Sequence, residues 1–155
     1  MRLAELDAGM ASHELLGRGS VHASLIRGGV ELSSYPGECV LGLERRTLPG
    51  ETVEQVEAEI AGLGDATART LLAREPFAID SEHDFVQLVR RSAGDAPIAG
   101  APYWTDAAFI AAAGIPTVLY GPGGEGAHAD VEWVSLADTA AVTNTLVAVA
   151  KEFCA

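Results

Sequence analysis

Patterns of apolar and polar residues predict a helix and two strands in the first part of the chain. Apolar residues recur at helical spacing over residues 2–16, so we expect a helix there. Residues 20–27 and 38–48 alternate between apolar and polar positions, which is typical of strands. Gly28 and Gly29 end the first run. We therefore expect the two strands to form a hairpin-like pair.

A second helix is predicted after the break at Pro49 and Gly50. Thr52 and Gln55 lie three residues apart, which is the spacing of a capping box. The apolar residues that follow keep a spacing of about 3.6 residues, so one face of this helix is expected to be packed and the other solvated. The solvated face carries four glutamates, Glu51, Glu54, Glu57 and Glu59.

Capping residues and apolar runs predict three helices and one strand in the second half of the chain. Ser81 is expected to begin the first helix, and Thr105 to cap an Ala-rich second one. The apolar run at 115–120 is typical of a short buried strand. A Gly-Pro-Gly-Gly loop follows it at 121–124, and Ser135 is predicted to cap the last helix.

The order of these elements predicts an α/β chain in two parts. Residues 65–79 have a composition that suggests helix, but a returning strand would suit their place after a β-β-α unit, and we predict a strand there. The first part is then β-β-α-β and the second α-α-β-loop-α. We expect the domains to be 1–79 and 80–155.

Composition narrows the classes of function. Lys and Arg number 10 against 22 Asp and Glu, a formal net charge of −12 that disfavours nucleic acid and anionic membrane surfaces as partners. The sequence holds no apolar run of the roughly 20 residues that a membrane-spanning helix needs. Cys39 and Cys154 lie far apart and predict no disulfide framework, which favours a cytoplasmic location. Cys39 is expected to be a core thiol on the apolar face of its strand.

The loop at 121–124 and His128 are the main candidates for chemistry. Ligands of open α/β sheets bind beyond the carboxyl ends of strands, and glycines let backbone N–H groups approach an anion. The glycines alone favour a plain tight turn. His128 follows in a loop of small residues, with Asp130 and Glu132 nearby to orient it, so a metal-binding role and a structural role both stay open.

Other polar residues have two interpretations. Arg46, at the end of the second strand, could hold a carboxylate bidentately or could simply be a solvated strand end. Asp106 is explained by the favourable interaction of a carboxylate with the start of a helix. The other three histidines, His13, His22 and His83, are predicted to lie on the surface.

The order of the motifs carries more information than any one of them. The first block runs from Gly19 to Thr52 and includes Tyr35-Pro36-Gly37-Glu38 and Glu44-Arg45-Arg46. The second contains Trp104-Thr105-Asp106-Ala107, Gly114-Ile115-Pro116-Thr117, Gly121-Pro122-Gly123 and Ala127-His128. In this order the blocks resemble the C-terminal half of the zinc-dependent amidohydrolases and exopeptidases that include acetylornithine deacetylase, succinyl-diaminopimelate desuccinylase, aminoacylase and glutamate carboxypeptidase.

The resemblance implies an activity and a set of site residues. It implies hydrolysis of N-acyl amino acids or small peptides by a metal-bound water between two zinc ions, with a glutamate as the base. His128 would be a ligand of one zinc ion. The implied substrate-binding residues are Arg46, which would grip the substrate carboxylate, and Gly121, Gly123, Gly124 and Asp106.

The resemblance also implies an architecture. Residues 1–79 would form a two-layer β-β-α-β lid of the α+β type, which pairs with the lid of a second subunit in a homodimer, and 80–155 would be part of an α/β catalytic domain. The family's general base and its other metal ligands precede the lid, and no such residues occur here. We therefore expect a C-terminal fragment with no catalytic residue of its own, inactive and without bound zinc when alone.

Two alternatives belong to other classes of function. The chain could be a non-catalytic module that keeps this fold for dimerisation or interaction. It could also be a phosphate-binding domain that uses the loop at 121–124, although the acidic charge disfavours that hypothesis.

Overall fold

The computed structural model describes residues 2–64 and 66–155, and these fall into two compact units. The first unit comprises the described residues up to Pro76 together with Gly100–Pro102, and the second comprises Phe77–Ala99 and Tyr103–Ala155. In this part of the chain all three sheets are two-stranded and antiparallel. The mixed α/β class predicted from the sequence is confirmed, although its sheets are shorter than expected.

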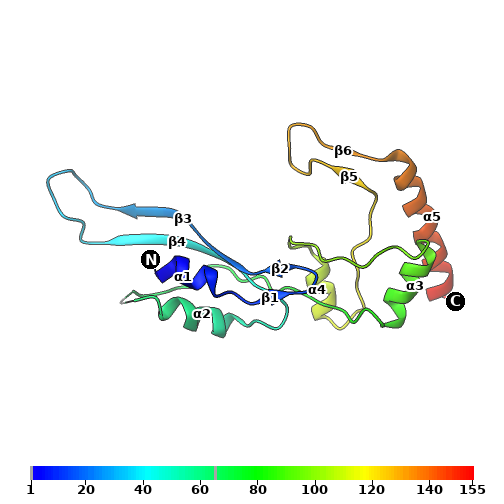
Figure 1. The fold of residues 1–155 in the computed structure, drawn as a ribbon, viewed down its shortest axis with the longest axis horizontal. Coiled ribbons are helices and arrows are strands. Elements are labelled where there is room, and N and C mark those ends of the chain that lie inside the picture. Colours follow the sequence, from blue (N-terminus) through cyan, green and yellow to red (C-terminus); the bar gives the residue numbers. More distant parts are fainter. Residues whose placement is uncertain (1, 65) are drawn as a thin grey trace. The chain divides into compact units, whose positions relative to one another are not determined.

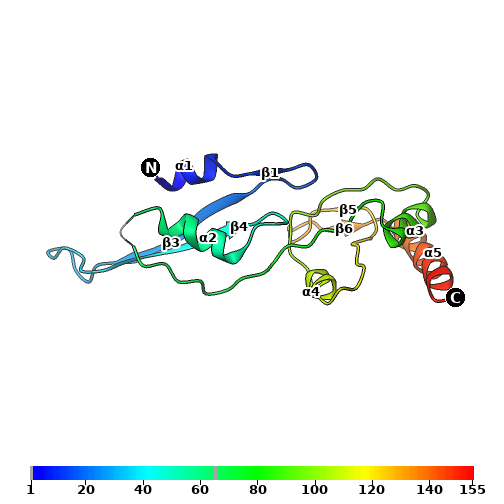
Figure 2. The ribbon, with the colours of Figure 1, turned by 90° about the horizontal axis from the view of Figure 1, so that it is seen from below.

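The first unit contains two helices and four strands in the described residues (Figure 1). In chain order they are α1 (Arg2–Ala8), β1 (Ser12–His13), β2 (Gly17–Arg18), β3 (Ser20–Gly28), β4 (Cys39–Arg46) and α2 (Val53–Ala61). The paired β3 and β4 form an extended hairpin in both views (Figure 2). The predicted strand pair and second helix are therefore confirmed.

The helix predicted over residues 2–16 is wrong beyond Ala8. The chain leaves the helix at Gly9, whose N–H still donates to the carbonyl of Glu5 at 3.0 Å, and then forms the short β1–β2 hairpin. The carboxylate of Asp7 accepts from the N–H of Val21 at 3.0 Å, which fixes the end of α1 on β3. This tertiary contact, together with the glycine, overrides a periodicity that continues in the sequence.

The β3–β4 hairpin has a regular register with one irregularity. Ser20 pairs with Arg46 at one end and Gly28 with Cys39 at the other, and the register shifts between Ala23 and Leu25, as in a β-bulge. Every residue of β3 after Val21 is exposed. Cys39 is exposed too, so the expectation of a core thiol is wrong. A two-stranded ribbon can be covered only by other elements, and none of those described covers this end.

The start of α2 agrees with the sequence in detail. The hydroxyl of Thr52 accepts from the N–H of Gln55 at 3.3 Å, and the Gln55 side chain accepts from the N–H of Thr52 at 2.8 Å. The predicted strand at 65–79 is wrong: Asp65 lies outside the described residues, and residues 66–79 form neither helix nor strand. Leu71 and Leu72 are exposed, and this segment pairs with no strand in the described chain.

The second unit is built around packing between two helices. Its elements are α3 (Asp84–Ser92), α4 (Ala107–Ala112), β5 (Gly124–Glu125), β6 (Trp133–Val134) and α5 (Leu136–Phe153). Helix α3 packs against α5, where Val86, Leu88 and Val149 are buried. The rings of Phe85 and Phe153 meet edge to face with centroids 5.1 Å apart. The helices form because each presents an apolar face to the other.

Three predicted features of this unit are corrected. Helix α3 begins after His83, not at Ser81, and the Nδ1 atom of His83 accepts from the N–H of Phe85 at 3.1 Å. Helix α4 has Asp106 at its N-cap position instead of Thr105. The run at 115–120 is not a strand. A buried strand takes hydrogen bonds from neighbouring strands, and no described strand pairs with this run.

The last helix is confirmed. The hydroxyl of Ser135 accepts from the N–H of Asp138 at 3.1 Å and caps α5 as predicted. Within the described residues, no helix is both long and apolar enough to cross a bilayer.

Candidate functional site

Arg46 is the last residue of β4 and presents an exposed guanidinium. Its Nε donates to the Oε1 atom of Glu44 at 2.8 Å, and the side chains of Arg46 and Glu44 are 61% and 59% exposed. An ion pair this exposed is weak and is readily exchanged for another carboxylate. Among the described residues, no other hydrogen bond is made by this guanidinium, so its two terminal nitrogens are available for bidentate binding.

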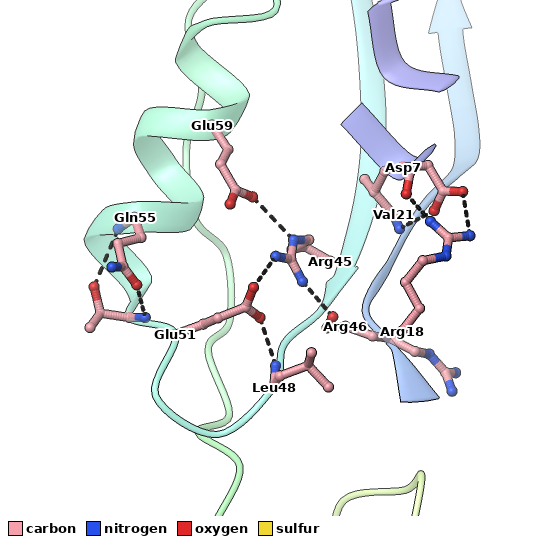
Figure 3. Close-up of polar contacts among 10 residues, drawn as sticks. Asp7, Arg18, Val21, Arg45, Arg46, Leu48, Glu51, Gln55 and Glu59 are labelled. Carbon is pink, nitrogen blue, oxygen red and sulfur yellow. Dashed lines mark hydrogen bonds and ion pairs between the residues drawn. The ribbon is translucent and has the colours of Figure 1, made fainter. Parts of the chain in front are cut away.

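Arg45 behaves in the opposite way, because successive side chains of a strand point to opposite faces. Its side chain is 5% exposed and faces α2 (Figure 3). Nη2 donates to Glu51 at 2.6 Å and Nε donates to Glu59 at 3.1 Å. Nη1 donates to the backbone carbonyl of Arg46 at 2.5 Å. Arg45 thus joins β4, the turn before α2, and α2 itself.

These three side chains, which we call the Arg45 cluster (Arg45, Glu51 and Glu59), were not predicted to meet. Glu51 and Glu59 were expected on a solvated helix face, but they are partly covered and paired with Arg45. Two consecutive arginines on a strand were the available signal, because one of them must point to the covered face.

The charges of the Arg45 cluster reinforce one another. Burial opposes the charge of Arg45, but the hydrogen bonds to Glu51 and Glu59 outweigh it and raise the pKa of the guanidinium above its ordinary value. Burial likewise opposes the charge of Glu51, yet the hydrogen bonds from Arg45 and from the N–H of Leu48 outweigh it and lower the pKa of this carboxyl. Arg45 and Glu51 are therefore both charged at neutral pH.

His128 lies in the turn that joins β5 to β6 in the second unit. The N–H of Ala129 donates to the carbonyl of Gly126 at 2.8 Å, and His128 itself has a left-handed φ of 65°. Gly126 has a φ of 78°, and a Cβ there would collide with the carbonyl oxygen of Val131. The imidazole of His128 is exposed and makes no hydrogen bond to any described residue. This turn holds the imidazole out toward solvent.

The glycine loop at 121–124 is tied to its own hairpin and to α5. The carbonyl of Gly123 accepts from the N–H of Ser135 at 2.9 Å, and Gly124 pairs with Val134 in the β5–β6 ladder. A Cβ at Gly123 would lie 2.8 Å from the Oδ2 atom of Asp138. Because that carboxylate stands beside the loop, its charge disfavours a bound phosphate there.

Asp106 and the histidines complete the set of predicted positions. Asp106 lies at the N-cap position of α4, exposed, and its side chain makes no cap hydrogen bond. His22 is exposed as predicted, with its Nε2 atom 2.9 Å from the hydroxyl of Ser20. His83 is exposed too, while His13 is half-buried in β1 rather than at a helix end. Arg46 belongs to the first unit, whereas Asp106, the glycine loop and His128 belong to the second.

The described side chains do not form a complete metal site. Residues 2–64 and 66–155 contain no group of three or more His, Cys, Asp or Glu side chains that could hold an ion. A protein zinc site takes about four ligands, at least three of them from the protein. One exposed imidazole can therefore serve only as one ligand of a larger set.

Comparison with known proteins settles the family. The sequence model of Peptidase family M20/M25/M40 matches residues 10–152, which span both units. The chain belongs to this family. Both Arg46 and His128 lie within the matched range. The broad assignment to a family of hydrolases is thereby confirmed, and enzymes of the M20 family are generally metal-dependent.

A curated relative is similar over most of the chain. N-formyl-4-amino-5-aminomethyl-2-methylpyrimidine deformylase of Halalkalibacterium halodurans is 26% identical over an alignment of 166 residues. The alignment covers 89% of this chain and 39% of that protein. The M20 chain described here thus spans about two fifths of the length of this relative. No solved structure matches the chain significantly.

Proposed function

We propose that this chain is the C-terminal part of a two-zinc amidohydrolase or exopeptidase of the M20 family, in the group that includes acetylornithine deacetylase and succinyl-diaminopimelate desuccinylase. The complete protein would hydrolyse N-acyl amino acids or small peptides. The observation that carries the proposal is the family match over residues 10–152, which includes both units and the two residues with the clearest site geometry. The chain alone is expected to be inactive and to bind no zinc.

In this proposal the first unit is the lid and Arg46 binds the substrate carboxylate. Two features support that role for Arg46. Its guanidinium stands exposed at a strand end, and its described partner, Glu44, is itself more than half exposed. A substrate carboxylate can therefore bind the terminal nitrogens without first breaking a buried interaction.

His128 is proposed as a ligand of one zinc ion in the complete enzyme. Its exposed imidazole, held by a turn and without a described hydrogen-bond partner, supports this role. The remaining ligands would come from residues outside the described set, because the described residues supply no group of three. We propose Gly121, Gly123, Gly124 and Asp106 as residues around the substrate.

A homodimer through the lid is part of the same proposal. The β3–β4 hairpin has exposed apolar side chains on both strands, among them Leu25, Ile26, Val40 and Leu41. Apolar side chains next to open strand edges favour pairing with a second copy. A cytoplasmic location is also proposed, because Cys39 and Cys154 are both exposed free thiols.

A second candidate function is a non-catalytic dimerisation or interaction module derived from the same fold. The observation that favours it is that the described residues offer no three-ligand metal group. The two candidates differ in what the longest polypeptide encoded by the gene should do, since the module needs neither zinc nor turnover.

The deciding experiment compares that longest polypeptide with the 155-residue chain. Zinc content is measured by atomic absorption, and hydrolysis is tested on N-acetyl and N-formyl amino acids and on the N-formyl aminopyrimidine named in the relative's description. We expect zinc-dependent turnover by the long form alone. A long form that dimerises but has neither zinc nor turnover would establish the module instead.

Variants of the long form test the residue roles. His128→Ala should lose most turnover and part of the zinc, whereas Arg46→Ala should mainly raise the KM. His22→Ala is the matched control, because His22 is exposed and lies outside the proposed site. Wild-type turnover and zinc content in His128→Ala would exclude it as a ligand.

A further inference from the structure

The side chain of Arg45 is hydrogen-bonded to the backbone of Arg46, the residue proposed to bind the substrate carboxylate. Its Nη1 atom donates to the carbonyl of Arg46 at 2.5 Å, while Nη2 and Nε are held by Glu51 and Glu59 (Figure 3). All three nitrogens of this guanidinium therefore have an acceptor, so it cannot rotate without breaking charged hydrogen bonds.

Glu51 extends this restraint along the chain to Leu48, two residues after Arg46. One of its oxygens accepts from Arg45 and the other accepts from the N–H of Leu48 at 2.6 Å. The same side-chain cluster thus holds the backbone at two points that directly follow the Arg46 side chain, namely the carbonyl of Arg46 and the N–H of Leu48. A guanidinium on a fixed backbone loses less conformational freedom when it binds a carboxylate.

Gly19 provides independent support, because it leaves room for the contact between Arg45 and Arg46. Gly19 is buried, and a Cβ at this position would lie 3.0 Å from the Nη1 atom of Arg45 and 3.1 Å from the carbonyl oxygen of Arg46. Any larger residue would press on the two atoms that form this hydrogen bond. Its φ is not in the left-handed region, so the space, rather than the backbone conformation, is what requires glycine here.

We infer that Arg45 is a positioning residue that holds the Arg46 guanidinium for substrates with a free carboxylate. This inference rests on the proposed function, in which Arg46 binds that carboxylate. All three guanidinium nitrogens of Arg45 have acceptors within the protein, so in this inference it acts through the backbone of Arg46. Its contribution should therefore depend on whether the substrate carries a carboxylate.

The test compares two substrates of the long form, an N-acetyl amino acid and the same compound with its carboxylate replaced by a carboxamide. Arg45→Met should raise the KM for the acid about tenfold and change kcat less than about twofold, since one charged hydrogen-bond network is worth about that factor. The kcat/KM for the carboxamide should not change. Arg45→Lys, which keeps the charge but not the fork, should give a smaller shift of the same kind.

Arg18→Met is the matched control. Arg18 is an exposed arginine of the same unit, is paired with Asp7 and lies outside the cluster, so both substrates should behave as with wild type. Gly19→Ala is the second variant, and it should raise the KM for the acid alone because its Cβ presses on the contact between Arg45 and Arg46. It decides the matter if Arg45→Met does not fold.

The outcomes separate this inference from the proposed function. If the wild type hydrolyses neither substrate, the proposed function and this inference both fail. Suppose that Arg46→Ala loses activity on the acid alone, whereas Arg45→Met and Gly19→Ala lower kcat/KM equally for both substrates or for neither. The proposed function then survives and the inference is overturned. A selective increase in the KM for the acid in both variants supports it.

Discussion

Replacing Arg45 by methionine should destabilise the first unit strongly, because the substitution leaves two carboxylates without their shared cation. Methionine keeps an unbranched apolar stem of similar length, so the loss is confined to three hydrogen bonds, two of which are also ion pairs. The size of the loss in the free energy of unfolding follows from how exposed the paired side chains are. Removing one partner of a fully buried pair costs about 3–5 kcal/mol, whereas exposed pairs contribute about 0–1 kcal/mol.

The Arg45 cluster lies between these limits. The Arg45 side chain is 5% exposed, but those of Glu51 and Glu59 are 20% and 33% exposed, so water partly screens the two carboxylates. We therefore expect Arg45→Met to lower the free energy of unfolding by about 2 kcal/mol. Arg46→Met is the matched control on the neighbouring residue, and it should lower this free energy by less than about 0.5 kcal/mol because its ion pair is exposed.

The assay must report on the first unit, because the chain has two units and its unfolding need not be a single transition. Hydrogen exchange of the α2 and β4 amides gives a local free energy of opening, and urea unfolding followed by far-UV circular dichroism gives the global one. Equal losses for Arg45→Met and Arg46→Met, or a loss below about 0.5 kcal/mol for Arg45→Met, would refute the reasoning.

The effect should also depend on pH. The pKa of the Glu51 carboxyl is lowered in the fold, so its contribution to stability is fully present above its ordinary value of 4.5 and is lost as the pH falls through the folded value. The difference between wild type and Arg45→Met should therefore be largest near pH 7 and should shrink below about pH 4.5. A difference that stays constant down to pH 3 would contradict this account of the cluster.

Three further predictions concern other elements. Thr52→Ala removes half of the capping box and should cost about 1 kcal/mol, measured as faster exchange of the α2 amides, and no change in exchange would count against the cap. Gly126→Ala should destabilise the β5–β6 turn by about 1–3 kcal/mol because it combines a φ of 78° with a collision at the Val131 carbonyl, whereas Gly37→Ala, with open space around it, should be nearly neutral in thermal unfolding. The backbone hydrogen bond from Val21 and the side chain of Arg18 lower the pKa of Asp7 below 3.8, so acid should remove its contribution as the pH falls through that lowered value. Asp7→Asn should flatten the acid limb of a pH titration of stability, and an unchanged limb would show that Asp7 does not contribute to it.

Local signals predicted the parts of the fold that local physics determines. The two strands β3 and β4 and the capping box at Thr52 are signalled by neighbouring residues, and all three are present as predicted. The run at 115–120 has equally good strand character, yet it is irregular. A strand exists only where another strand supplies its hydrogen bonds, and that partner cannot be deduced from the run itself.

The two adjacent arginines show the same limit at the candidate site. Alternation predicts that Arg45 and Arg46 face opposite sides of β4, but it does not say which side α2 covers. That depends on the path of the chain after Pro49, which is fixed by Glu51 through its hydrogen bonds to Leu48 and Arg45. The sequence therefore identified the exposed arginine of the candidate site through a resemblance, whereas the covered one was visible only in the structure.

His128 is the position where the fold and the proposed chemistry make opposite demands. A non-glycine residue at a φ of 65° costs of order 1 kcal/mol relative to glycine, so glycine would suit this turn better. The imidazole makes no hydrogen bond that would offset this cost, since it is exposed and hydrogen-bonds to no described residue. An exposed imidazole without a described partner is free to bind a metal ion, which is the role that we propose for His128.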